Sequence, residues 1–198
     1  MLRISQVESM VRRVLPLLAL VLCSACVDAM TPRAQSENVL ALGTIAYVKN
    51  DYAEALRLLK PLAGKSNAKA AVLVGRMHYW GEGVKKNVAL AIHYFKKAAK
   101  KGDKEGHYQL GLIHLQRREF QEAYSHLETA ALQGYLFAKY ELANLLAQGP
   151  PNLRDVCRAQ QLYESIAQDY VPAWNSAKAL SSKLGDTCAS ELKVPASN

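Results

Sequence analysis

Features that would indicate a membrane-spanning protein or a familiar enzyme are missing from this 198-residue sequence. The apolar run at 14–22 has nine residues, whereas a helix needs about 20 to cross a bilayer. The sequence contains no HExxH zinc motif, no GxSxG nucleophile motif and no GxxxxGK[ST] phosphate loop. We therefore expect no catalytic residues, no metal site and no cofactor.

The first 25 residues are typical of a bacterial secretion signal. Two arginines precede the apolar run, and the small residues Ser24 and Ala25 stand directly before Cys26. This order is similar to a lipobox, in which the cysteine is lipidated and becomes the new N-terminus. The alternative is ordinary cleavage after Ala25 or after residue 29, which would leave a periplasmic protein without an anchor.

These signals predict the organisation of the chain. We expect a lipoprotein signal peptide at 1–25, lipidated Cys26 and a linker at 26–35, a repeat domain at 36–184 and a tail at 185–198. Met10 could equally be the true start, because the signal is complete without the residues before it. In bacterial lipoproteins an Asp directly after the cysteine favours inner-membrane retention. Its absence here favours the periplasmic side of the outer membrane.

Cysteine is scarce beyond the signal and Cys26, where only Cys157 and Cys188 remain. An exported chain meets oxidising conditions, so an even cysteine count predicts a disulfide. The bridge would close a loop of about thirty residues and stabilise the fold by roughly 3–4 kcal/mol in the chain-entropy model. No CxxC motif or neighbouring histidine accompanies either residue, which argues against a metal site.

Small residues recur along the chain at a nearly fixed period. One series has steps of 32, 36 and 32 residues, and a second has steps of 36, 32 and 36. A period of 20–50 residues is the signature of a solenoid built from repeats. The two series are Gly43, Gly75, Gly111 and Ala143, and Ala55, Ala91, Ala123 and Ala159.

Each repeat is predicted to hold two helices, because apolar and small residues recur at three- and four-residue spacing in both halves. We call the first helix of each repeat the A helix and the second the B helix. The fold class is therefore all-α: a right-handed α-solenoid of about four helix pairs plus a C-terminal capping helix. The A helices are expected at 36–48, 69–80, 104–117 and 136–148, the B helices at 52–63, 87–101, 120–133 and 155–168, and the capping helix at 172–184.

The segment AAVLVGRMHYWGEGVKKNVALAIHYFKKAAKKG resembles the Sel1-like repeat, a relative of the tetratricopeptide repeat. Residues 68–102 match nearly all of the family pattern, with Val74 in place of leucine and His78 in place of an aromatic residue. Residues 40–65 and 108–134 match without the Gly-x-Gly insert, as in tetratricopeptide repeats, and 138–168 has a longer loop with two prolines. In this pattern the glycines of the insert belong to a helix connection and not to a ligand site.

The resemblance implies a binding surface on the A helices, which line the inner groove of such repeats. Matched positions place tyrosines one period apart there, beside other aromatic, charged and amide side chains. These residue types are common at protein-binding hot spots. The alternative is that the aromatic rings pack between adjacent repeats. The predicted groove residues are Tyr47, Arg76, Tyr79, Trp80, Tyr108, Leu112, Tyr140 and Asn144.

The net charge of +8 allows an acidic partner. Seven lysines at loop and B-helix positions of the second repeat should face outward, where they form either a solvated face or a site for an acidic polysaccharide. A periplasmic location argues against nucleic acid. Histidines such as His78 and His114 fall at packing positions, not in a metal-binding pattern. The seven are Lys85, Lys86, Lys96, Lys97, Lys100, Lys101 and Lys104.

The function that these observations predict is binding. We expect a lipid-anchored adaptor of the bacterial cell envelope that docks a protein partner in its groove and helps to assemble an envelope or exopolysaccharide-secretion complex. One alternative is a β-lactamase-like or peptidoglycan-acting hydrolase, since some cysteine-rich Sel1-like proteins are described that way. Those proteins carry a cysteine pair in most repeats, whereas this chain has at most one. The other alternative is a purely structural periplasmic subunit.

Overall fold

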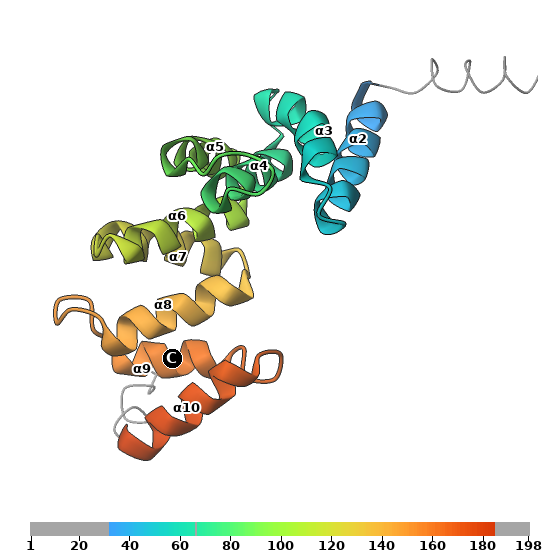
Figure 1. Cartoon of the computed structure of the whole chain (residues 1–198). Coiled ribbons are helices and arrows are strands. Elements are labelled where there is room, and N and C mark those ends of the chain that lie inside the picture. Colours follow the sequence, from blue (N-terminus) through green and yellow to red (C-terminus); the bar gives the residue numbers. More distant parts are fainter. Residues whose placement is uncertain (1–31, 66, 185–198) are drawn as a thin grey trace, which may run out of the picture.

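The structure, a computed structural model, describes residues 32–65 and 67–184. Within these residues it contains nine helices and no strand, and each helix packs mainly on its two neighbours in the chain. Figure 1 shows the helices stacked as an open arc from α2 to α10. The helices are α2 (Pro32–Val48), α3 (Tyr52–Gly64), α4 (Ala68–Trp80), α5 (Val88–Lys100), α6 (Lys104–Gln116), α7 (Phe120–Leu132), α8 (Leu136–Gln148), α9 (Val156–Glu164) and α10 (Val171–Leu184).

The solenoid of helix pairs predicted from the period is confirmed, and most helix ends lie within one residue of the prediction. The A helices are α2, α4, α6 and α8, and the B helices are α3, α5, α7 and α9. Two ends differ. Helix α2 begins at Pro32, four residues early, and proline is tolerated in the first turn of a helix. Helix α9 ends at Glu164, four residues early, because the chain turns at 165–169. None of the described helices is long and apolar enough to cross a membrane.

The glycine series allows each A helix to lie directly against its B helix. A Cβ atom on Gly43, Gly75 or Gly111 would stand 2.6–2.8 Å from a carbon of the leucine or phenylalanine side chain opposite. Contacts below 3.0 Å are overpacked, so these positions need glycine. At the fourth position Ala143 is fully buried.

Gly81 and Gly83 belong to the connection between α4 and α5, as predicted. Both adopt positive φ angles, +82° and +69°, and Gly81 ends α4 in the left-handed conformation. A Cβ atom on Gly83 would stand 2.4 Å from the Cβ of Tyr52 in the preceding repeat. The second glycine therefore allows one repeat to approach the next.

Candidate partner-binding groove

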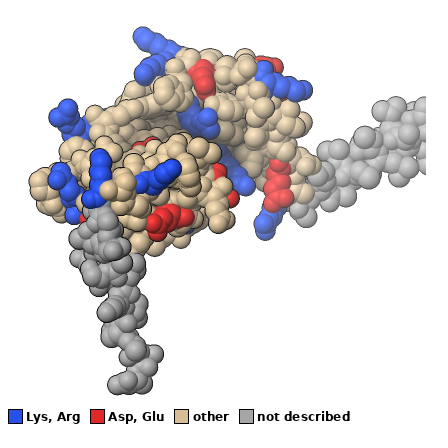
Figure 2. Space-filling view, turned by 90° about the horizontal axis from the view of Figure 1, so that it is seen from below, with Lys and Arg blue, Asp and Glu red and all other residues tan. Residues whose placement is uncertain are grey.

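The A helices approach one another across repeats, α2 with α4 and α4 with α6, more closely than the B helices do. A stack of helix pairs curves toward the side on which its helices are closest, so the A helices line the inner side. Figure 2 shows a hollowed face of the molecule, over which basic and acidic side chains are spread without forming one continuous patch.

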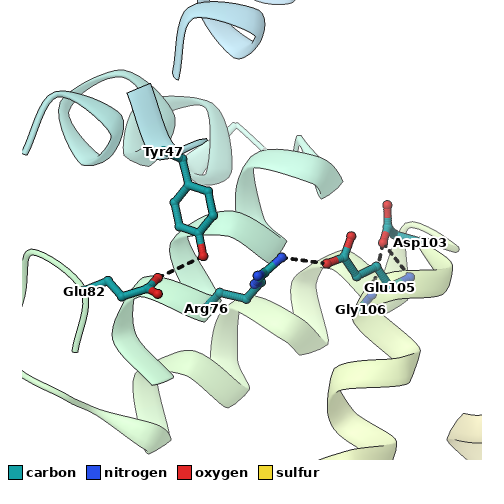
Figure 3. Close-up of polar contacts among 6 residues, drawn as sticks. All are labelled: Tyr47, Arg76, Glu82, Asp103, Glu105 and Gly106. Atoms are coloured by element: carbon teal, nitrogen blue, oxygen red, sulfur yellow. Dashed lines mark hydrogen bonds and ion pairs between the residues drawn. The ribbon is translucent and has the colours of Figure 1, made fainter. Parts of the chain in front are cut away.

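A polar network joins the first three A helices (Figure 3). The Tyr47 hydroxyl donates a hydrogen bond to Glu82 Oε2 at 2.9 Å. The Arg76 guanidinium lies 5.4 Å from the centre of the Tyr47 ring and pairs with Glu105 Oε1 at 3.4 Å. Asp103 accepts hydrogen bonds from the backbone N–H groups of residues 105 and 106, and these fix the start of α6. Tyr47 and Arg76 are thus brought together, and their polar groups are used within the protein.

Burial shapes the electrostatics of this network. It is the main cause that raises the pKa of Tyr47 to about 12, and the hydrogen bond to Glu82 adds to the effect. Burial also raises the pKa of Glu105, although the positive charge of Arg76 opposes the shift. The network therefore contains a neutral phenol that donates and a half-buried carboxyl group held by a single arginine.

Tyr79 and Trp80 lie at the C-terminal end of α4. Their rings meet edge to face at 4.9 Å, and the Tyr79 hydroxyl donates to Gln116 Oε1 of α6 at 2.7 Å. The ammonium group of Lys86 lies 5.7 Å from the centre of the Tyr79 ring. Trp80 is 61% exposed, so this predicted groove residue keeps a large apolar surface in solvent.

A contiguous group of five rings, which we call the aromatic cluster, occupies the C-terminal half of the inner side. Neighbouring ring centres are 5.0–6.4 Å apart, within the range of favourable edge and tilted contacts. Phe137 is 45% exposed and the tyrosines are half-buried. The members are Tyr108 of α6, Tyr135 and Tyr170 from the turns before α8 and α10, and Phe137 and Tyr140 of α8.

The tyrosine hydroxyl groups differ in their hydrogen-bond partners. Those of Tyr47, Tyr79 and Tyr163 are hydrogen-bonded to side chains of other helices or loops. In the described part of the chain, the four hydroxyls of the aromatic cluster have no such partner. Burial is the first cause that raises the pKa of Tyr108 and of Tyr135 to about 12. These phenols therefore stay protonated and can donate a hydrogen bond to a ligand.

Tyr135 occupies a position that other repeats use to cap a helix. At the N-caps of α4 and α6, Asn67 and Asp103 accept backbone N–H groups. Tyr135 has the same extended backbone at the N-cap of α8 but makes no side-chain cap hydrogen bond. Replacing such a cap costs about 1 kcal/mol of stability. Helix α8 thus lacks a side-chain N-cap, and the residue at this position contributes a ring to the aromatic cluster instead.

The remaining predicted residues are placed as follows. Leu112 is half-buried on α6, and Asn144 accepts a hydrogen bond from the Tyr163 hydroxyl at 2.6 Å. Cys157 lies on α9, but Cys26 and Cys188 lie outside the described residues, so lipidation and the disulfide stay predictions.

The lysines of the second repeat are exposed, except that Lys97 is half-buried and its ammonium group approaches the backbone oxygen of Gly64 at 3.5 Å. Two of them differ from the prediction because they reach the inner side. Lys86 lies over Tyr79, and Lys104 lies 5.9 Å from the ring centre of Tyr135.

Four of the five histidines are half-buried within the repeats, and His93 is exposed. His78 stacks on Tyr94 with ring centres 5.9 Å apart. The Nδ1 atoms of His107 and His126 lie 3.1 Å apart, and His114 Nδ1 lies 2.6 Å from the carboxylate of Glu119. No group of three or more possible metal ligands converges within the described ranges.

Comparisons with known proteins agree with this architecture. The sequence model of the Sel1 repeat matches residues 40–66, 68–103 and 104–135. The alginate biosynthesis protein AlgK of Pseudomonas syringae pv. tomato is 31% identical over 154 residues, which cover 71% of this chain and 32% of AlgK.

Two solved structures are similar in fold. A protective antigen of uropathogenic Escherichia coli with an SLR fold aligns with a TM-score of 0.69 at 22% identity, over 76% of this chain and 34% of its own. A Sel1 repeat protein from Oxalobacter formigenes aligns with a TM-score of 0.55 at 26% identity, over 63% of this chain and 97% of its own. This chain therefore spans about a third of the length of AlgK and of the E. coli antigen.

Proposed function

The chain is a protein of Sel1 repeats, and we propose that it is an adaptor of the bacterial cell envelope that holds a protein partner on the aromatic cluster. The observation that carries this proposal is the set of four tyrosine hydroxyls, unpartnered within the described residues, around the exposed Phe137 ring. A partly exposed aromatic surface with free donors suits a partner segment that offers apolar side chains and backbone carbonyl oxygens.

The position of Tyr135 supports the same surface. A ring at this N-cap contributes contacts to Tyr108 and Phe137 but leaves the first backbone N–H groups of α8 without a side-chain cap. A residue that weakens the start of its own helix is explained if its ring contacts a partner protein. The network around Tyr47 and Arg76 offers no such free hydrogen-bond donor, because the Tyr47 hydroxyl bonds to Glu82 and Arg76 pairs with Glu105.

The charges beside the aromatic cluster restrict the partner. Glu105 and Glu141 lie close enough to raise the pKa of Tyr108, and Lys104 lies over Tyr135. Both signs are therefore present within reach of a bound segment. We expect a largely apolar segment with a few charged groups and not a strongly charged polymer.

The envelope location is supported by the signal-like N-terminus and by the relative's name. The signal and the cysteine that follows it fit export and lipid anchoring. AlgK is named as an alginate biosynthesis protein, which places one relative of this chain in exopolysaccharide production. We infer that this chain serves an envelope complex of a similar kind, on the periplasmic side of the outer membrane.

Site-specific photo-crosslinking in intact cells tests the docking surface. A photoreactive phenylalanine analogue at position 137 should capture a discrete protein, which mass spectrometry identifies. The matched control carries the analogue at Leu132, which is 81% exposed on the B helix α7. Equal capture at both positions would contradict a dedicated site on the aromatic cluster.

Tyr135→Asn separates binding from folding. Asn regains the cap that Asn67 provides in α4, worth about 1 kcal/mol, and loses ring contacts of about 0.5–1.5 kcal/mol, so stability should change little. Capture at position 137 should nevertheless fall several-fold. Undiminished capture in this variant would refute the role of the cluster, and the absence of any captured protein would favour a purely structural subunit.

A further inference from the structure

Lysines gather at one edge of the first two repeats, which we call the basic edge. It is formed by the ends of the B helices α3 and α5 and by the starts of the A helices α4 and α6. Lys97 of α5 joins its two parts, because its ammonium group approaches the backbone oxygen of Gly64 at 3.5 Å. The corresponding turns of the later repeats, at 133–135 and 165–170, contain no lysine or arginine. The members of the basic edge are Lys65, Lys69, Lys97, Lys100, Lys101 and Lys104, all exposed except the half-buried Lys97.

Few negative charges balance the basic edge. Asp103 caps α6, and Glu105 pairs with Arg76. At the start of α2, Arg33 and Glu37 pair with each other and leave no net charge. None of the six lysines forms a salt bridge within the part of the chain that the structure describes. The basic edge therefore has ammonium groups that an external anion can reach.

The needs of the fold do not explain all of these lysines. The C-terminal end of a helix attracts positive charge, which accounts for Lys97 and Lys100 in the last turn of α5. Lys69 and Lys104, however, lie in the first turns of α4 and α6, where the helix dipole disfavours a cation. Lys97 and Lys101 are four residues apart, a spacing at which like charges repel each other. The free protein thus contains a repulsion that an anionic surface would relieve.

The chain enters the solenoid at this same edge. Ser36, near the start of α2, lines a hollow together with Lys65. Cys26 precedes Pro32, the first residue of α2, by six residues, and six residues span at most about 20 Å. A lipid on Cys26 would therefore hold the basic edge close to the membrane surface.

We propose that the basic edge rests on the anionic phospholipid head groups of the membrane that holds the anchor. In the cell this arrangement rests on the proposed lipid anchor, but the attraction itself comes from the six lysines. A lysine carries a compact charge on a flexible stem, which suits mobile phosphate groups. An acidic polysaccharide is the other anion that fits the charge. Sugars are also bound by stacking on aromatic rings, and among the six only Lys104 has an aromatic ring against it in the described chain.

Vesicle sedimentation of the full mature chain tests the proposal, with Cys26→Ser to keep the protein free of lipid. This parent protein should bind vesicles with about 30% phosphatidylglycerol in about 0.1 M salt and be released in about 0.5 M salt. Vesicles of phosphatidylcholine alone should bind it at least tenfold more weakly. Replacing three lysines together should weaken binding to the anionic vesicles at least 20-fold, because each lysine near such a surface contributes about fivefold, or about 1 kcal/mol. This variant carries Lys69→Gln, Lys100→Gln and Lys101→Gln.

The lipid-free assay separates this proposal from the lipid anchor and from the aromatic cluster, because neither takes part in it. The basic edge acts together with the lipid and does not replace it, since salt weakens the attraction. The Cys26→Ala protein is therefore still expected in the soluble fraction of cells after a salt wash.

The matched control removes three exposed charges at the opposite edge, with Lys85→Gln, Lys86→Gln and Arg117→Gln. It has the same net charge as the first variant and should bind within about threefold of the parent, and far-UV circular dichroism checks that both are folded. A parent protein that does not bind the anionic vesicles, or a control that loses as much binding as the first variant, would overturn the proposal. Release by polygalacturonate at a charge concentration below that of the lipid would overturn it too, and would assign the basic edge to an acidic polysaccharide.

Discussion

Gly75→Ala tests the register of the repeats, because it adds a single Cβ atom at a close contact between α4 and α5. The new Cβ would stand 2.6 Å from Cε1, 2.9 Å from Cδ1 and 3.2 Å from Cζ of Phe95. Phe95 is completely buried, so its ring cannot turn into solvent to make room. Inserting a methyl group into such a core typically costs about 1–3 kcal/mol.

The higher helix propensity of alanine offsets part of this loss of stability. Alanine is favoured over glycine inside a helix by up to about 1 kcal/mol. The expected net loss is therefore about 1–2 kcal/mol, and in a chain of this size each kcal/mol lowers the melting temperature by about 2–4 °C. We expect the melting temperature to be about 2–8 °C below that of the wild type, as measured by thermal unfolding with circular dichroism at 222 nm.

Gly64→Ala is the matched control. Gly64 is also helical, has an ordinary φ angle and has no atom within 4 Å of the site of a new Cβ. This variant should be as stable as the wild type or slightly more stable. If Gly75→Ala has the same melting temperature as Gly64→Ala, the tight contact between α4 and α5 is not as described, and the register of the repeats has to be revised.

Four further predictions address the anchor, the disulfide, the histidines and the enzyme alternative. Cys26→Ala should move the protein from the membrane fraction to the soluble periplasmic fraction, and a variant that stays in membranes would refute the lipid anchor. Cys157 and Cys188 should react with a maleimide only after unfolding and reduction, so labelling after unfolding alone would exclude the disulfide. Burial, and then the neighbouring charge of His107, lowers the pKa of His126 to about 4, whereas the pKa in an unfolded chain is near 6.5. The unfolded state therefore binds the proton first, and the stability of the fold should decrease as the pH falls from about 6.5 to 4. His126→Gln should make the melting temperature less dependent on pH in this range. The purified protein should not hydrolyse nitrocefin, and turnover above a boiled sample would revive the hydrolase alternative.

The aromatic cluster shows where reasoning from the sequence reached the site and where it stopped. Tyr108 and Tyr140 were predicted because they recur one period apart on A helices, and the structure brings both into one cluster. Tyr135 and Tyr170 were missed because they lie in turns, outside the helical pattern. A signal was present, since Tyr135 stands where the two preceding repeats have Asn67 and Asp103 as helix caps.

The architecture follows from the sequence, because small residues at a fixed period, with helical spacing between them, fit helix pairs that pack alike in every repeat. Gly75 and Gly111 mark the points at which the two helices of a pair come closest. The contacts between side chains of successive repeats do not follow from the period, because the curvature of the stack sets the distances between residues far apart in sequence. The structure joins Arg76 to Glu105, leaves the hydroxyls of the aromatic cluster free within the described chain, and leaves large apolar side chains of α2 exposed, such as Leu42 and Val48.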